Sequence, residues 1–324
     1  MTNILITGGS GFLGSHLVNY LSKNKKNNII ALDNNFRGIT KNLKKRKNVK
    51  FKRIDIRKKD KIKNIMKNVD VVIHLAFING TNYFYEKPEL VIDVGLKGTL
   101  NLIELSNNSN IKKFIFASSS EVYQKPYKIP TDEKEMCKIP NVKNPRYSYG
   151  ASKLIGEIAT LHMLKKGIKK IIFRPHNLYG TKMGFNHIIP EIISKIYKSS
   201  KKFKKNTAII KMQGSGDETR SFCYIDDAIK QIEKILNKGK NNEIYNVGTM
   251  EEVKIYNVIN IIGRSLNIKL HIKKTKIKEG STSRRCPNMK KTFKLGYKSK
   301  FRLRKGIEIV SNWYKHHLYL QEKK

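Results

Sequence analysis

The feature that most constrains this chain is a glycine-rich segment that follows its first apolar stretch. Residues 3–6 (Asn-Ile-Leu-Ile) suit a buried strand, and residues 12–21 carry apolar side chains at helical spacing. Residues 7–14 read Thr-Gly-Gly-Ser-Gly-Phe-Leu-Gly. In such a strand-to-helix turn, backbone N–H groups approach a pyrophosphate closely and the helix N-terminus attracts the anion. We predict that a dinucleotide is bound by Gly8, Gly11, Phe12, Leu13 and Gly14.

A second apolar stretch, residues 28–32, ends at an acidic residue, Asp33. An acid at this position accepts hydrogen bonds from the ribose hydroxyls of NAD and repels the 2′-phosphate of NADP. We therefore predict NAD as the cofactor. Two alternatives stay open, because Asp33 could be an ordinary turn residue and the nearby Arg37 could bind a phosphate.

Strand-like and helix-like segments alternate from residue 1 to about residue 175. This alternation predicts an α/β fold with a Rossmann-type, doubly wound parallel sheet. Further strands are expected at residues 51–54, 69–74, 114–116 and 170–173, and a helix at residues 89–105. The later pattern is irregular, so we predict an NAD-binding domain at 1–175 and a smaller, substrate-binding lobe at 176–324. Residues 226–250 are expected to return to the sheet domain, and 306–320 to form a packing helix.

The chain is strongly basic, with 67 Lys and Arg residues against 25 Asp and Glu and a formal net charge of +42. Such a charge raises the possibility of nucleic-acid binding. However, only 12 of these residues are arginine, and the lysines are spread along the chain among many Asn and Ile residues. Because no recognition helix or zinc motif accompanies them, we interpret the charge as a solvated surface and predict no nucleic-acid partner.

Targeting and metal signals are missing from the sequence. The first residues suit a strand and not a basic, then apolar leader, and no apolar run approaches the length of a membrane span. We therefore expect a cytoplasmic protein without a membrane partner. Cys137, Cys223 and Cys286 lack metal-ligand spacing, so we expect no metal site.

Tyr149 and Lys153 stand four residues apart in the segment Tyr-Gly-Ala-Ser-Lys. Positions i and i+4 share a helix face, so the ammonium can lie near the phenol hydroxyl. A free tyrosine has a pKa of about 10, and a nearby cation favours its phenolate. On spacing alone, an exposed ring beside a charge is the simpler interpretation. The upstream glycine turn favours a base in a nicotinamide-dependent enzyme.

Further motifs occur in an order that is typical of one enzyme family. They are Asp55-Ile56, His74-Leu75-Ala76, Ser118 to Tyr123 (Ser-Ser-Ser-Glu-Val-Tyr), Arg174-Pro175-His176-Asn177, Thr219 to Phe222 (Thr-Arg-Ser-Phe) and Arg285 to Asn288 (Arg-Cys-Pro-Asn). With these motifs, the glycine turn and the Tyr149–Lys153 pair, the chain resembles the extended short-chain dehydrogenase/reductases that act on nucleotide sugars. These include UDP-glucose 4-epimerases, UDP-glucuronate decarboxylases and dTDP-glucose 4,6-dehydratases. The resemblance covers essentially the whole chain.

The resemblance implies roles for the residues at matching positions. The cofactor is expected to contact Asp55, Ile56, Leu75, Ala76, Tyr149 and Lys153. The hydroxyl three residues before the Val-Tyr pair, which is catalytic in the family, is Ser119. Family enzymes contact the substrate diphosphate and nearby groups through an asparagine and two arginines, which correspond to Asn177, Arg220 and Arg285.

The implied chemistry begins with oxidation of a sugar hydroxyl. Tyr149 takes the hydroxyl proton while hydride leaves the same carbon for NAD, and Ser119 holds the developing carbonyl oxygen. The later steps depend on Glu121, because family epimerases usually have an uncharged residue there. Dehydratases have an Asp-Glu pair and decarboxylases a Ser-Glu pair, and this chain has Ser120-Glu121.

We rank a nucleotide-sugar 4-epimerase first, because residue 120 is not an acid. The stretch around Asn177 also departs from that of the decarboxylases. A decarboxylase or 4,6-dehydratase that uses Glu121 is the alternative, and a non-catalytic cofactor-binding protein is a remote one. The resemblance also implies a homodimer and a role in polysaccharide biosynthesis.

Two positions depart from the family pattern. Gly95 stands where most relatives have Asn, and Gln124 replaces the glycine that usually follows the Val-Tyr pair. Both departures indicate a divergent branch of the family.

Overall fold

The computed structural model of the protein describes residues 1–276 and 282–318. Its centre is a parallel seven-stranded sheet. The strands are β1 (Thr2–Thr7), β2 (Asn27–Asp33), β3 (Val49–Arg53), β4 (Val71–His74), β5 (Lys113–Ala117), β6 (Lys169–Pro175) and β11 (Glu243–Val247). Their order is β11-β6-β5-β4-β1-β2-β3, so the winding reverses between β1 and β4. The predicted α/β class with a Rossmann-type sheet is confirmed, and a ligand crevice is expected at this reversal.

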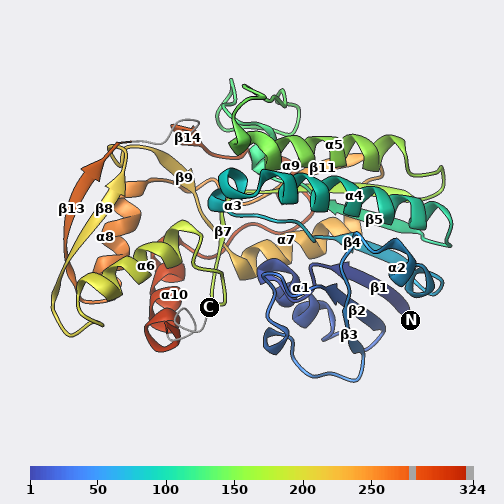
Figure 1. Ribbon diagram of the computed structural model, residues 1–324, viewed down its shortest axis with the longest axis horizontal. Coiled ribbons are helices and arrows are strands. Elements are labelled where there is room, and N and C mark those ends of the chain that lie inside the picture. Colours follow the sequence, from blue (N-terminus) through green and yellow to red (C-terminus); the bar gives the residue numbers. More distant parts are fainter. Residues whose placement is uncertain (277–281, 319–324) are drawn as a thin grey trace.

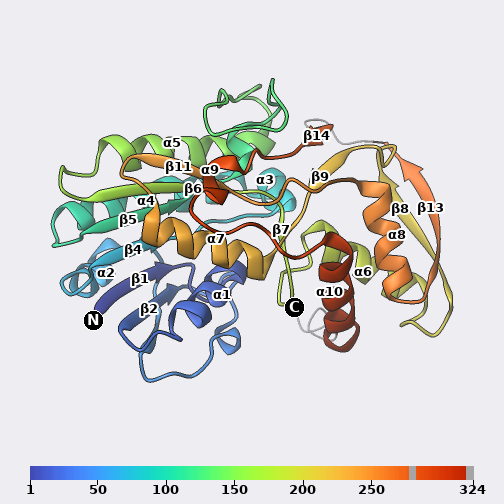
Figure 2. The same ribbon diagram turned by 180° about the vertical axis from the view of Figure 1, so that it is seen from behind.

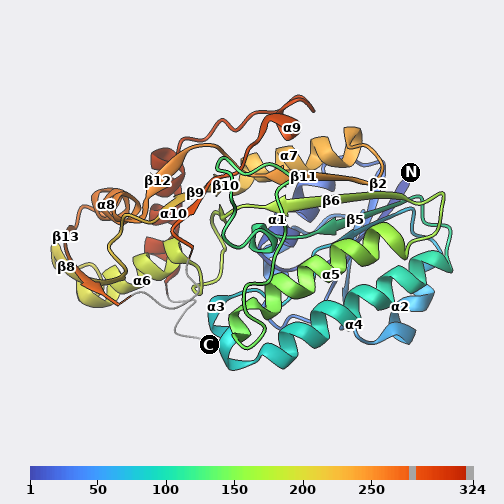
Figure 3. The ribbon, with the colours of Figure 1, turned by 90° about the horizontal axis from the view of Figure 1, so that it is seen from above.

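Helices cover both faces of the sheet. On one face lie α1 (Phe12–Leu21) and α7 (Ile225–Lys238), and on the other lie α2 (Lys59–Met66), α4 (Pro88–Asn107) and α5 (Ser148–His162), as Figures 1 and 3 show. Each face of the sheet has its own hydrophobic core, and successive strand side chains point to opposite faces. In β1, Ile4 and Ile6 belong to one core and Leu5 belongs to the other. This double burial explains why the strands are almost continuously apolar.

The smaller lobe is formed mainly by later segments of the chain and lies at one end of the sheet domain (Figures 1 and 2). Its helices are α6 (Ile188–Ser199), α8 (Ile255–Ser265) and α10 (Leu303–His317). Its strands are β7 (Leu178–Tyr179), β8 (Thr207–Gln213), β9 (Thr219–Ser221), β10 (Cys223–Tyr224), β12 (Glu252–Lys254), β13 (Lys269–Thr275) and β14 (Arg284–Arg285). Short helices are η1 (Thr40–Asn42), α3 (Thr81–Glu86), η2 (Ser120–Val122), η3 (Pro145–Tyr147) and α9 (Lys290–Phe293).

The predicted elements can be compared with these bounds. The helix expected at 306–320 is α10, which begins three residues earlier, while residues 319 and 320 lie outside the described part of the chain. β11 pairs with β6, so residues 243–247 belong to the central sheet. The assignment of 226–250 to the NAD-binding domain stays a prediction. The domain boundary near residue 175 stays a prediction. None of the helices in the described segments has the length and apolarity that crossing a membrane requires.

Candidate active site

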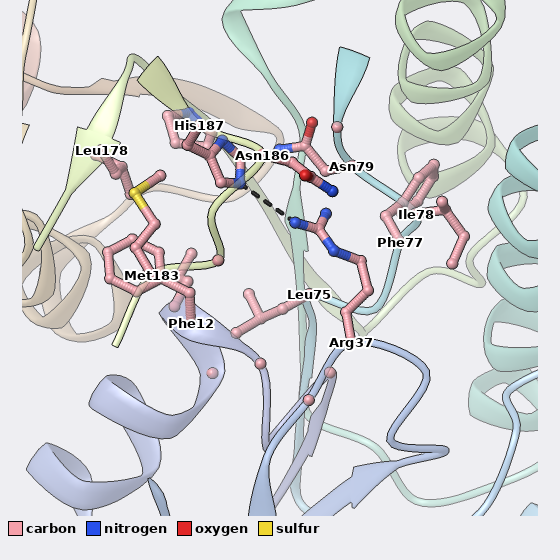
Figure 4. A pocket seen from close by; sticks show the side chains of 18 of the residues that line it. Phe12, Arg37, Leu75, Phe77, Ile78, Asn79, Leu178, Met183, Asn186 and His187 are labelled. Atoms are coloured by element: carbon pink, nitrogen blue, oxygen red, sulfur yellow. Dashed lines mark hydrogen bonds between the residues drawn. The ribbon is translucent and has the colours of Figure 1, made fainter. Parts of the chain in front are cut away.

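A cavity of about 1040 Å³ lies at the carboxyl ends of the central strands, where loops of the sheet domain meet the lobe. All of the predicted cofactor residues line it, as do Ser119, Glu121, Asn177 and Arg285. Figure 4 shows part of this cavity, with Phe12 and Leu75 on the side of the sheet domain and Met183 and His187 on the side of the lobe. The fold therefore gathers in one place residues that are far apart in sequence.

The glycine turn packs its backbone directly against the loop after β4. Gly8 has a φ of +69°, and a Cβ at this residue would lie 2.8 Å from the Ala76 nitrogen. A Cβ at Gly14 would lie 1.9 Å from the Gly8 carbonyl oxygen. Gly11 precedes α1 and gives it no side-chain cap. A close backbone turn at an uncapped helix N-terminus fits the pyrophosphate of a dinucleotide.

Two carboxylates, Asp33 and Asp55, line the cavity near the ends of β2 and β3. Asp33 accepts from the backbone N–H groups of Ser10 (3.1 Å) and Asn35 (2.8 Å), which fixes its orientation. Hydrogen bonds from the Arg57 side chain hold the pKa of Asp55 down to about 2. Both groups fit acceptors for the hydroxyl or amino groups of an adenosine.

Arg37 extends across the cavity to the lobe, where its Nη2 lies 3.4 Å from Nε2 of His187 (Figure 4). It therefore makes no ion pair with Asp33 at the end of β2. This orientation does not support the alternative in which Arg37 binds a 2′-phosphate there.

Tyr149 lies in the first turn of α5 and is held by aromatic rings. Its ring stacks on Phe84 with centroids 5.0 Å apart, and Phe77 meets its edge at 5.9 Å. Burial raises the pKa of Tyr149, while a side-chain hydrogen bond with Ser119 and the charge of Arg37 act to lower it. In the protein alone the phenol is therefore protonated at neutral pH.

Lys153 follows one turn later on α5, as the spacing predicted, but its hydrogen bond goes elsewhere. Its Nζ donates to the Ala117 carbonyl at 2.5 Å and lies 3.3 Å from the centroid of the Phe77 ring. The centroid of the Tyr149 ring is 5.7 Å away. Burial lowers the pKa of Lys153 well below its usual value. In this arrangement, the electrostatic effect of Lys153 on the Tyr149 phenol is therefore weaker than the sequence predicts.

Phe77 is a site residue that the sequence patterns did not reveal, and it explains the departure at position 95. A Cβ at Gly95 would lie 2.6 Å from the Phe77 ring and 3.0 Å from Cβ of Ser152. The ring occupies the space that the usual asparagine side chain would need. In the sequence, only its position directly after the His-Leu-Ala motif could have indicated that Phe77 belongs to the site.

Glu121 is ion-paired and not free. Its Oε1 lies 2.7 Å from Nη1 of Arg285, and its Oε2 lies 3.8 Å from Nη2 of Arg146. Burial acts to raise the pKa of Glu121, but the charges of these two arginines outweigh it and bring the pKa to about 2. The carboxylate is therefore ionised at neutral pH and is a weak base.

Gln124 completes a ring of hydrogen bonds around this ion pair. Its Nε2 donates to the Glu121 carbonyl at 2.5 Å, and its own carbonyl accepts from Oγ1 of Thr282 at 3.4 Å. Nη2 of Arg285 in turn donates to Oγ1 of Thr282 at 3.1 Å. Gln124 has a φ of +51°, which favours glycine and explains why glycine is usual there. The ring joins the turn after β5 to the strand-like segment at 282–285.

The three predicted substrate residues do not all face the cavity. Asn177 and Arg285 line it, whereas Arg220 is absent from the lining. The Arg220 guanidinium donates to the backbone carbonyls of Thr219 (2.7 Å) and Thr282 (2.5 Å). Its role in substrate binding stays a prediction. Within residues 1–276 and 282–318, no group of three or more potential metal ligands comes together.

Comparison with known proteins gives a consistent result. The model of the NAD dependent epimerase/dehydratase family matches residues 4–248. The chain is 35% identical over 318 residues to a putative UDP-glucose 4-epimerase of Methanocaldococcus jannaschii, which covers 96% of this chain and 98% of that protein. It is 27% identical to UDP-glucuronic acid decarboxylase 3 of Arabidopsis thaliana over 95% of this chain and 87% of that protein.

Solved structures have the same fold. UDP-glucose 4-epimerase of Thermotoga maritima, solved with UDP-glucose, superposes with a TM-score of 0.87 at 24% identity, covering 98% of this chain and 100% of that one. A dTDP-glucose 4,6-dehydratase of Streptomyces venezuelae, solved with NAD, gives a TM-score of 0.88 at 22% identity, covering 98% of each chain. Since the family model matches more than half of the sequence, the chain belongs to the NAD dependent epimerase/dehydratase family and is an NAD-dependent enzyme.

Proposed function

We propose that this enzyme is a nucleotide-sugar epimerase that oxidises the sugar at C4 to a ketone and then reduces it from the other face. The observation that carries the proposal is the state of Glu121. With its pKa at about 2 and Arg285 at 2.7 Å, this carboxylate is a poor base for removing a proton from the neighbouring sugar carbon. Loss of water or CO₂ needs further acid–base chemistry, whereas epimerisation needs only reversible oxidation.

The proton transfer is assigned to Tyr149 and Ser119. Tyr149 Oη accepts the proton of the C4 hydroxyl as the C4–H bond breaks, and Ser119 donates a hydrogen bond to the oxygen that becomes the carbonyl. Bound NAD⁺ supplies the hydride acceptor and a positive charge that favours the phenolate. On the return step Tyr149 gives the proton back. The rings of Phe84 and Phe77 fix the position of the phenol.

A nucleotide-sugar decarboxylase is the second candidate. Arg285 and Arg146 both face Glu121, so the site holds more positive than negative charge and could bind the carboxylate of a uronic acid. The Ser120-Glu121 pair also matches the family's decarboxylases. A 4,6-dehydratase is less well supported, because buried Ser120 is not a carboxylic acid that could protonate a leaving hydroxyl.

Replacing Glu121 separates these candidates. For Glu121→Gln we expect kcat of epimerisation to stay within about threefold, since no proton passes through this group. KM for the nucleotide sugar should rise about tenfold, because a charge-assisted bond that positions Arg285 is lost. Steady-state kinetics measure both values.

The control for this variant is Glu191→Gln. Glu191 also forms an ion pair, with Lys195, but it is exposed on α6, so its loss should change neither constant. A collapse of kcat in Glu121→Gln at unchanged KM would show that Glu121 takes part in the chemistry and would favour the decarboxylase or dehydratase.

We also propose a homodimer formed through α4 and α5. Four large aliphatic side chains on these helices are exposed to between 40% and 54%: Ile92, Leu100, Ile155 and Ile158. Exposed apolar residues on two adjacent helices are typical of a protein interface. We expect wild type to sediment as a dimer and an Ile155→Glu, Ile158→Glu double variant to sediment as a monomer. An unchanged dimer would place the interface elsewhere.

A further inference from the structure

Arg37 is a cation that crosses the cavity, and it has no carboxylate partner within the described part of the chain. Its Nη2 lies 3.4 Å from Nε2 of His187, and its guanidinium carbon lies 5.7 Å from the centroid of the Tyr83 ring (Figure 4). A Cβ at Gly80 would come within 3.6 Å of Nη1, and one at Gly184 within 3.4 Å of Nη2. Backbone from the sheet domain and from the lobe therefore approaches the guanidinium closely.

The segment that carries Arg37 is fixed to the glycine turn. The Ser10 N–H donates to Asp33 Oδ2 (3.1 Å) and the Ser10 hydroxyl donates to Asn35 Oδ1 (2.8 Å). The Ile39 N–H donates to the Ser10 carbonyl at 3.0 Å. These bonds anchor the residues on both sides of Arg37 beside the N-terminus of α1, where the helix dipole favours an anion.

The cavity offers Arg37 no free anion of its own. The three carboxylates in the described lining, Asp33, Asp55 and Glu121, all accept hydrogen bonds from other groups. His187 is neutral, because burial lowers its pKa to about 3. Since a guanidinium can only donate, the hydrogen bond requires the tautomer in which His187 Nε2 is the acceptor. Burial also lowers the pKa of Arg37, although a guanidinium stays charged. Arg37 is half-buried, and a partly desolvated charge without an anion is costly until an anion joins it.

We propose that Arg37 binds a nucleotide diphosphate within this cavity. The planar fork of a guanidinium matches two phosphate oxygens and forms charge-assisted hydrogen bonds with them. Two ligands carry this group, the pyrophosphate of NAD and the diphosphate of a nucleotide sugar. The first source follows from the family, and the second rests on the function proposed above.

Isothermal titration calorimetry with NAD⁺, UDP and adenosine tests the proposal, after any copurified nucleotide has been removed on charcoal. We expect Arg37→Gln to weaken binding of NAD⁺ or UDP about tenfold or more, as the loss of a charge-assisted bond predicts. Adenosine has no phosphate, so its Kd should stay unchanged. Arg37→Lys should give an intermediate value, because it keeps the charge and loses the fork.

The matched control is Arg264→Gln at the exposed end of α8, outside the cavity lining. This variant lowers the formal net charge of +42 by one unit, as Arg37→Gln does, so it controls for the change in overall charge. A loss confined to NAD⁺ assigns the cofactor pyrophosphate, and a loss confined to UDP assigns the substrate. Equal Kd values for Arg37→Gln and Arg264→Gln with both ligands, or an equal loss of adenosine binding, would overturn the proposal. Because Kd is measured and not turnover, failure of the epimerase assignment leaves the NAD⁺ result valid.

Discussion

Tyr149→Phe is expected to lower kcat by about 10³-fold while NAD stays bound, because the variant removes only the hydroxyl that transfers the proton. The phenyl ring keeps its stacking on Phe84 and its edge contact with Phe77, so the site should keep its shape. The measurement pairs turnover of a nucleotide sugar with quantitation of NAD released on denaturation.

The control for this variant is Tyr256→Phe, which removes a phenol hydroxyl from the exposed side of α8. It should match wild type in both assays. Near-normal turnover of Tyr149→Phe would contradict the assignment of Tyr149 as the base. Loss of NAD together with turnover would instead show that the hydroxyl supports the cofactor site.

Gly14→Ala is expected to weaken NAD binding by about 5-fold to 150-fold, the range that corresponds to about 1–3 kcal/mol of overpacking. The added Cβ would lie 1.9 Å from the Gly8 carbonyl oxygen, which is backbone and cannot rotate away. The turn must therefore open, and its N–H groups move from the pyrophosphate position. Calorimetry with NAD⁺ measures the loss, and circular dichroism checks that the variant is folded.

Gly11→Ala provides a graded comparison in the same turn. Its Cβ would lie 3.2 Å from the Gly8 carbonyl oxygen, a tight contact that a small shift relieves. Its effect on the Kd for NAD⁺ should be clearly smaller than that of Gly14→Ala. If Gly14→Ala fails to fold, Gly11→Ala should still fold and bind NAD⁺ with a Kd near that of wild type. Equal effects of the two substitutions would contradict the steric explanation.

The sequence predicted the sheet domain well, because its strands are local apolar runs that end in recognisable turns. The glycine turn, Asp33 and the Tyr149–Lys153 pair could be recognised because each belongs to a local pattern of fixed spacing, and all of them line the cavity. The predicted helix at 12–21 coincides with α1, since the residue pattern alone determines its buried face. Short lobe strands such as β7 and β9 were not predicted, because their pairing depends on distant segments.

The contacts between motifs could not be predicted from the chain. Nothing in the spacing indicates that Arg285 pairs with Glu121, because the ion pair joins residues from the sheet domain and the lobe. The same applies to Phe77 over Gly95, where a large and a small residue compensate across two elements. Sequence reasoning also placed the Lys153 charge at the phenol, whereas burial and the Ala117 carbonyl hold the amine differently.

The most direct test of the account is the product formed from a panel of UDP-, GDP-, CDP- and dTDP-linked sugars and uronic acids with NAD⁺. Mass spectrometry gives the product mass, and NMR gives its configuration at C4. We predict a product of unchanged mass and inverted configuration, with Glu121 remaining ionised beside Arg285. A product that has lost CO₂ or water would contradict the epimerase assignment and make Glu121 a catalytic residue.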